Sequence, residues 1–169
     1  HAEGAKASIQ LGHCGNMTHY YTCGCMPVGP SSGFNLYSPT IVRGLKEAEI
    51  MELVKDLPEM TLDIELKEYP TEGNEETAYN VCDGVLAIID SYGYTDRCVI
   101  NTWNGKLHEY IHNKYGDKYK QHVYYPIECQ GECTIDPYSY GYCVCMFGHG
   151  EYIATKEEFE NMRKKYGIG

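Results

Sequence analysis

The chain has little positive charge. Among its 169 residues, 14 are lysine or arginine and 24 are aspartate or glutamate, so the formal net charge is -10 at pH 7. Nonspecific nucleic-acid binding and attachment to anionic membranes both depend on basic patches. The charge balance therefore argues against nucleic acid and anionic membrane surfaces as partners.

Long apolar runs are also missing. No segment approaches the ~18 apolar residues of a transmembrane helix, and none has the pattern of a signal peptide. Membrane insertion is therefore not expected. Tryptophan and phenylalanine are scarce, at 1 and 3 residues against 17 tyrosines, yet an apolar fraction of 43% suffices for one domain with a hydrophobic core.

Nine cysteines are present, and an odd number cannot all pair within one chain. Cys82 lies in an apolar helical stripe and Cys98 in a predicted strand, which favours buried free thiols over a disulfide framework. Cys143-x-Cys145 belongs to a group of Cys and His residues suitable for zinc, but its spacing differs from the usual structural pairs. Free thiols without a visible signal peptide predict a cytoplasmic protein. A signal peptide lost before His1 stays an alternative, because the abrupt ends of the chain suggest a segment of something longer.

Strand and helix patterns alternate along the chain. Strands are predicted at 5–13, 61–67, 97–103, 121–126 and 141–147, helices at 46–56, 75–92, 105–115 and 156–166, and a long loop at 14–45. This order predicts an α/β fold of parallel βα units, although no crossover helix is readable between the last two strands. The spacing favours a partial or recombined (β/α)₈ TIM barrel, since a complete one typically needs about 250 residues.

Cap residues mark the ends of the predicted helices. Asn74 is expected to cap the helix at 75–92, and Thr155-x-x-Glu158 has the pattern of a capping box. Glycines suited to the C-terminal ends follow three helices: Gly93, Gly116 and Gly167.

Residues 61–67, TLDIELK, combine a strand pattern with charge. Three aliphatic residues alternate with Asp63, Glu65 and Lys67, which predicts one apolar and one charged face. Taken alone, the pattern favours a solvated face with a local Glu–Lys pair.

The surrounding sequence changes that interpretation. The segments TLDIELK, YGYTDRCVINTWNGKLHEYI, GDKYKQHVYYP and TKEEFENMRKKYGI follow one another within residues 58–169. In order and spacing they resemble the glycerophosphodiester phosphodiesterases, which are (β/α)₈ barrels. The resemblance implies that Glu65 binds a divalent metal, Mg or Ca, and that Lys67 is a catalytic residue facing the phosphate of a small phosphodiester.

The chain also departs from that family. Its HRG, ELD and HD motifs, which supply two acid/base histidines and two further carboxylate ligands, are absent, and Thr102-Trp103 replaces an SF pair. A metal-dependent phosphodiester hydrolase that is incomplete, and weakly active or inactive, is therefore expected.

Residues 1–57 resemble a different family. HAEGAKASIQLGHCGN is similar to the third strand of the old yellow enzyme group, flavin-dependent ene-reductases with a Gln-Leu-x-His signature. PVGPSS and VRGLKEAEIMELVKD are similar to the loop and helix that follow. The resemblance implies FMN binding by Gln10 and His13.

Two alternatives to the hydrolase therefore stay open. One is an FMN-binding ene-reductase fragment, and the other is an engineered or recombined barrel without catalytic activity. Open sheet edges in such a partial barrel favour a homo-oligomer. Among the histidines, His108 and His112 are expected at the rim of a surface helix, while His122 is a weak site candidate at the start of a strand.

Overall fold

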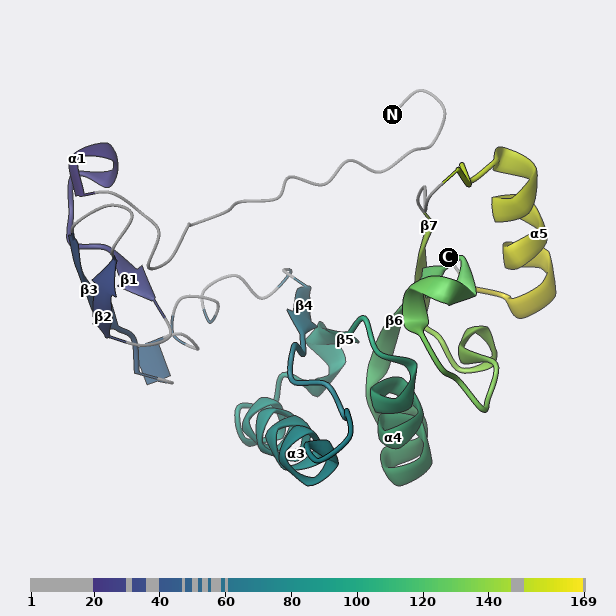
Figure 1. Ribbon diagram of the computed structural model, residues 1–169, viewed down its shortest axis with the longest axis horizontal. Helices are drawn as coiled ribbons and strands as arrows, with labels where there is room; N and C mark the ends of the chain where they lie inside the picture. Colours follow the sequence, from purple (N-terminus) through teal and green to yellow (C-terminus); the bar gives the residue numbers. More distant parts are fainter. Residues whose placement is uncertain are drawn as a thin grey trace. The chain divides into compact units, whose positions relative to one another are not determined.

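A computed structural model gives the structure of the chain (Figure 1). It describes residues 20–29, 32–35, 40–46, 48–49, 52, 55, 59, 61–146 and 151–168. Gln10, His13 and the predicted strand 5–13 lie outside these residues. Contacts within the chain divide it into two units, His1–Pro58 and Glu59–Gly169.

The first unit contains short elements: α1 (Tyr20–Cys23), β1 (Val28–Gly29), β2 (Gly33–Asn35) and β3 (Thr40–Gly44). Strand β3 pairs with β1 in parallel and with β2 antiparallel. The prediction of a loop over 14–45 is therefore wrong for this part. Strands of two to five residues are too short for a readable period. Five residues of the predicted helix 46–56 are described: Lys46 is not helical, while Ala48, Glu49, Glu52 and Lys55 are.

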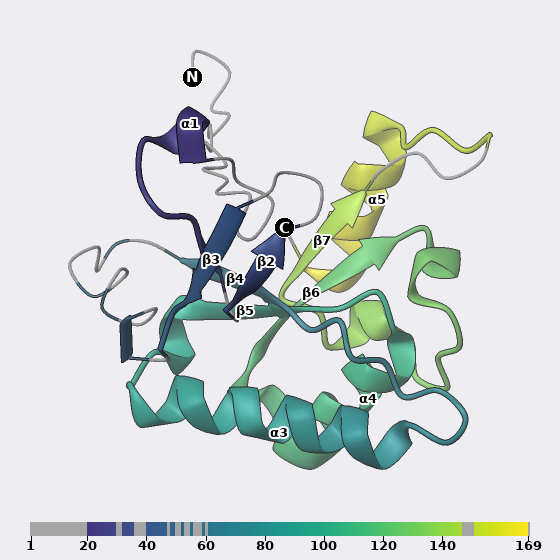
Figure 2. The ribbon, with the colours of Figure 1, turned by 60° about the vertical axis from the view of Figure 1, so that its left-hand side comes forward.

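The second unit is mixed α/β. Its sheet has four parallel strands in the order β4-β5-β6-β7: β4 (Leu62–Glu65), β5 (Cys98–Asn101), β6 (Lys120–Tyr125) and β7 (Cys143–Met146). Its α-helices are α3 (Glu75–Ser91), α4 (Gly105–Tyr115) and α5 (Lys156–Tyr166). Strand order thus follows chain order, and Figures 1 and 2 show α3 and α4 on the same side of the sheet.

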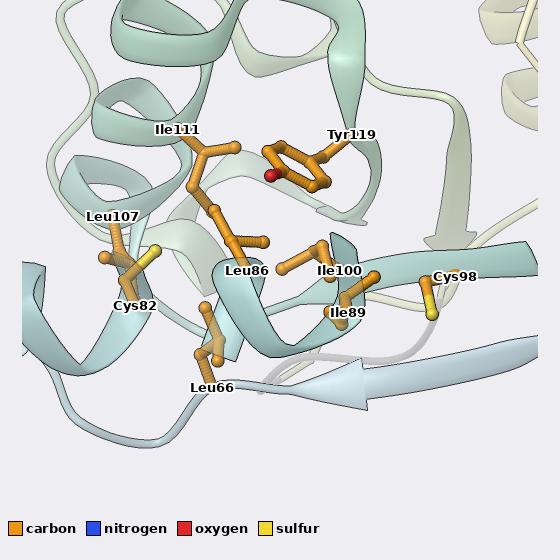
Figure 3. Close-up of a cluster of buried hydrophobic side chains, with 9 residues drawn as sticks. All are labelled: Leu66, Cys82, Leu86, Ile89, Cys98, Ile100, Leu107, Ile111 and Tyr119. Atoms are coloured by element: carbon orange, nitrogen blue, oxygen red, sulfur yellow. The ribbon is translucent and has the colours of Figure 1, made fainter. Parts of the chain in front are cut away.

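That side of the sheet carries the core. Leu66 after β4 and Ile100 of β5 pack in one cluster with Leu86 of α3 and Leu107 of α4 (Figure 3). The cluster also contains Cys82, Ile89, Cys98, Ile111 and Tyr119. A second cluster joins Val123 of β6 to α5 through Met162. Because side chains alternate along a strand, Asp63, Glu65, Asn101 and His122 point to the opposite face, together with the apolar Val99.

Helix ends agree with the sequence except at Asn74. Thr155 and Glu158 form the predicted capping box of α5, and φ is +69° at Gly167, which ends that helix. Asn74 stands at the start of α3, but its side chain makes no cap hydrogen bond. Its Nδ2 donates to Glu68 Oε1 at 2.6 Å and to the Tyr69 carbonyl oxygen at 3.2 Å, so the side chain binds the segment before the helix.

Two 3₁₀ turns, η4 (Ile127–Gln130) and η5 (Pro137–Ser139), occupy the connection between β6 and β7. Glu109 of α4 fixes this connection. Its carboxylate accepts hydrogen bonds from the backbone N–H of Thr134, from the Thr134 hydroxyl at 2.9 Å and from the backbone N–H of Ile135 at 2.6 Å. All residues of this connection are described, and none of them is in an α-helix. The sequence likewise showed no crossover helix between these two strands.

The prediction that His108 lies at a surface rim is wrong. His108 is fully buried, with Nδ1 2.7 Å from Gln121 Oε1 and Nε2 3.1 Å from the Thr102 carbonyl oxygen. Burial lowers its pKa to about 4, so the imidazole is neutral at pH 7. His112, one turn later, is half-buried and stacks on Tyr140 with ring centroids 4.4 Å apart.

Candidate functional site

The face of the sheet opposite the helices carries the candidate site. Register aligns Glu65 with Asn101, Asn101 with His122, and His122 with Cys143. Residues aligned in a parallel sheet point to the same face, as do residues two apart on one strand. We call the side chains of Asp63, Glu65, Asn101, His122 and Tyr124 the polar face.

Glu65 and Lys67 meet at the carboxyl end of β4. Lys67 Nζ lies 3.2 Å from Glu65 Oε2, and the two side chains are 72% and 32% exposed. The carboxyl ends of parallel strands are where α/β folds place their ligands. An ion pair this exposed contributes little to stability, and solvent reaches both side chains.

Asp63 and His122 form a second pair, from strands that are not neighbours. His122 Nδ1 lies 2.8 Å from Asp63 Oδ2, although β5 separates β4 from β6. Val99 and Asn101 of β5 lie between them in the register, on the same face. The His122 side chain is 19% exposed and that of Asp63 is 49% exposed, so solvent reaches both.

Asn101 occupies the centre of the polar face with an unused acceptor. It is 8% exposed, and its Oδ1 has no hydrogen-bond partner in the part of the chain that the structure describes. A buried acceptor without a partner costs about 1–3 kcal/mol, which a ligand or a water could recover.

Tyr124 adds an aromatic surface. Its ring stacks on Trp103 with centroids 4.2 Å apart and planes 13° apart, and Trp103 is 41% exposed. Burial raises the pKa of the Tyr124 phenol, and the nearby carboxylates of Glu65 and Asp63 add to the rise, against a hydrogen bond with Asn101. The phenol is therefore protonated and neutral at pH 7.

The thiols of β7 lie beside this site. Burial raises the pKa of Cys143 to about 11 and also raises that of Cys145. Both are free and protonated at pH 7, and only thiolates are good metal ligands. Among the described residues, no group of three or more His, Cys, Asp or Glu side chains could hold a metal ion.

The sequence located only part of this site. Glu65, Lys67 and His122 lie on or beside the polar face, while Gln10 and His13 fall outside the described residues. The sequence did not indicate Asp63, Asn101, Trp103 or Tyr124 as a group. Their period-two spacing on three strands was readable, but the register that aligns them was not.

Comparisons with known proteins give no relative. No family model matches the chain, and no curated protein or solved structure matches it significantly. In the described residues, no helix is both long and apolar enough to cross a membrane.

Proposed function

We propose that residues 58–169 are part of a (β/α)₈ barrel of the glycerophosphodiester phosphodiesterase type, and that the polar face binds a small phosphodiester. The Glu65–Lys67 pair at the carboxyl end of β4 carries the proposal, because it sets a carboxylate beside an ammonium 3.2 Å away. The sequential order of four parallel strands supports it, since neighbouring strands in such barrels follow chain order.

Lys67 supplies the positive charge for the phosphate. Lysine binds phosphate as a point charge, and 72% exposure of this side chain leaves its ammonium accessible. It would stabilise the negative charge that develops on the phosphoryl oxygens in the transition state.

Glu65 would hold the divalent cation, Mg or Ca. Mg²⁺ keeps several waters and is commonly bound through one or two carboxylates together with substrate phosphates, so one accessible Glu65 carboxylate fits it. When bound, the cation polarises a phosphoryl oxygen. The described residues contain no group of three or more ligands for a metal ion. The phosphate of the substrate would therefore supply part of the coordination, and we expect the binding of cation and of substrate to depend on each other.

Turnover is expected to be slow. The family's two acid/base histidines are absent from the sequence, and losing general acid/base catalysis costs ~10²–10⁴-fold in rate. Binding is therefore the primary measurement, and hydrolysis the second.

The test is calorimetric titration of the chain with a glycerol phosphodiester, with and without Mg²⁺ or Ca²⁺. Glu65→Gln should abolish the metal dependence of binding, and Lys67→Met should weaken binding about tenfold or more. Glu76→Gln and Lys164→Met make the same charge changes at exposed helix positions and should change nothing. Equal affinities for all five proteins would overturn the proposal.

A further inference from the structure

The proposed binding of metal and phosphate by Glu65 and Lys67 assigns no role to the Asp63–His122 pair. The carboxylate accepts from Nδ1 of the imidazole at 2.8 Å, which leaves Nε2 as the acceptor nitrogen of the ring. Within the described residues, Nε2 has no hydrogen-bond partner. A carboxylate that fixes the tautomer and orientation of a histidine is the arrangement by which enzymes prepare a general base.

Asn101 gives an independent sign that a ligand binds next to this histidine. It is aligned with Glu65 on one side and His122 on the other, and its buried Oδ1 lacks a partner in the described part of the chain. A bound water or a substrate hydroxyl would satisfy this oxygen. In the register, Asn101 thus lies between Glu65 and His122.

We infer that His122 is the general base of the hydrolysis, with Asp63 as its positioning residue. The inference rests on the proposed function and assigns a proton acceptor that the family resemblance does not supply. Nε2 takes a proton from water as the water oxygen bonds to phosphorus. The bond between phosphorus and the alcohol oxygen breaks, and the leaving alkoxide takes a proton from solvent. His122 then returns its proton to solvent, so one water and one diester give one monoester and one alcohol.

The inference is tested by hydrolysis of bis(p-nitrophenyl) phosphate with Mg²⁺. Its p-nitrophenolate leaving group needs no proton, so the rate reports the attack of water alone. His122→Gln should lower kcat about 100-fold or more, in line with the usual range for a general base. His112→Gln, on α4 and stacked on Tyr140, is the matched control and should keep the rate.

Two further measurements separate a chemical role from a structural one. Added imidazole should restore hydrolysis to His122→Ala but not to Glu65→Gln. Asp63→Asn should lower kcat with KM unchanged, because the carboxylate orients the base and does not bind substrate. Circular dichroism and urea unfolding check that each variant folds.

The outcomes distinguish this inference from the proposed function. Hydrolysis that survives His122→Gln but is lost in Glu65→Gln overturns the base and keeps the site. If the chain binds the diester with metal through Glu65 but hydrolyses it no faster than buffer alone, the general base is likewise overturned and the binding site is kept. If the chain neither binds nor hydrolyses phosphodiesters, both fail.

Discussion

Protonation of the buried His108 should make the stability of the second unit depend on pH. Burial lowers the pKa of this imidazole from 6.5 to about 4, so the folded state binds the proton less readily than the unfolded chain. The contribution of His108 to stability is therefore constant above pH 6.5 and is lost as pH falls from 6.5 to 4. Each pKa unit corresponds to ~1.4 kcal/mol, so the loss is about 3 kcal/mol.

The contacts of His108 explain why the cost is this large. The His108 side chain is 0% exposed, so water does not reach it. Its two hydrogen-bond partners, Gln121 and the Thr102 carbonyl oxygen, are both uncharged. A charged imidazolium there could donate to both oxygens, which favours the charged form, but it would lose its hydration, and burial is the largest cause of the lowered pKa.

Urea unfolding at several pH values between 4 and 7.5 measures this effect. The free energy of unfolding of the wild type minus that of His108→Gln should fall by about 3 kcal/mol across the window. Taking the difference cancels the contribution of carboxylates that titrate in both proteins. Asp90 is one of them: its hydrogen bond with Lys118 is the largest cause that lowers its pKa, to about 2. Equal slopes for the two proteins would refute the reasoning. If the variant does not fold, NMR titration of the His108 ring in the wild type decides, and a pKa near 6.5 would refute it.

Three further predictions concern packing, capping and thiol reactivity. Leu86→Ala in the core of Figure 3 should lower the free energy of unfolding by about 2–5 kcal/mol in urea titration, and a loss below 1 kcal/mol would contradict the burial. Thr155→Ala should cost about 1 kcal/mol by the same assay, because it removes the oxygen that caps α5, whereas Thr155→Ser should cost less. Burial raises the pKa of the Cys82 thiol to about 12, so at pH 8 iodoacetamide should label exposed Cys25 and leave Cys82 unlabelled until urea is added. Equal labelling of both thiols in the native protein would contradict this.

Local sequence signals predicted the local structure well. The capping box of Thr155 and Glu158 and the left-handed Gly167 depend on residues within four positions of each other, so the sequence contained their whole cause. The apolar stripe of α3 likewise placed Cys82 in the core. Alternation in TLDIELK predicted which side chains of β4 share a face, although the strand itself is shorter, at Leu62–Glu65.

Contacts between distant segments were not predictable in the same way. His108 looked like a rim residue because its two partners, Gln121 and the Thr102 carbonyl, lie on other elements. Asp63 and His122 are 59 residues apart, and only the register of three strands brings them together. The apolar alternation fixes which side chains of a strand face the core, but a shift of two residues keeps that facing, so the pattern alone does not bring Asp63 to His122.

The most direct measurement is an NMR titration of the ¹⁵N-labelled chain with a glycerol phosphodiester in the presence of Mg²⁺. If the polar face is the binding site, the amide signals that move first should belong to residues 63–67, 101–103 and 122–124, and Lys67→Met should suppress their movement. Shifts confined to residues away from this face, or no shifts at millimolar diester, would contradict a phosphodiester site on the sheet.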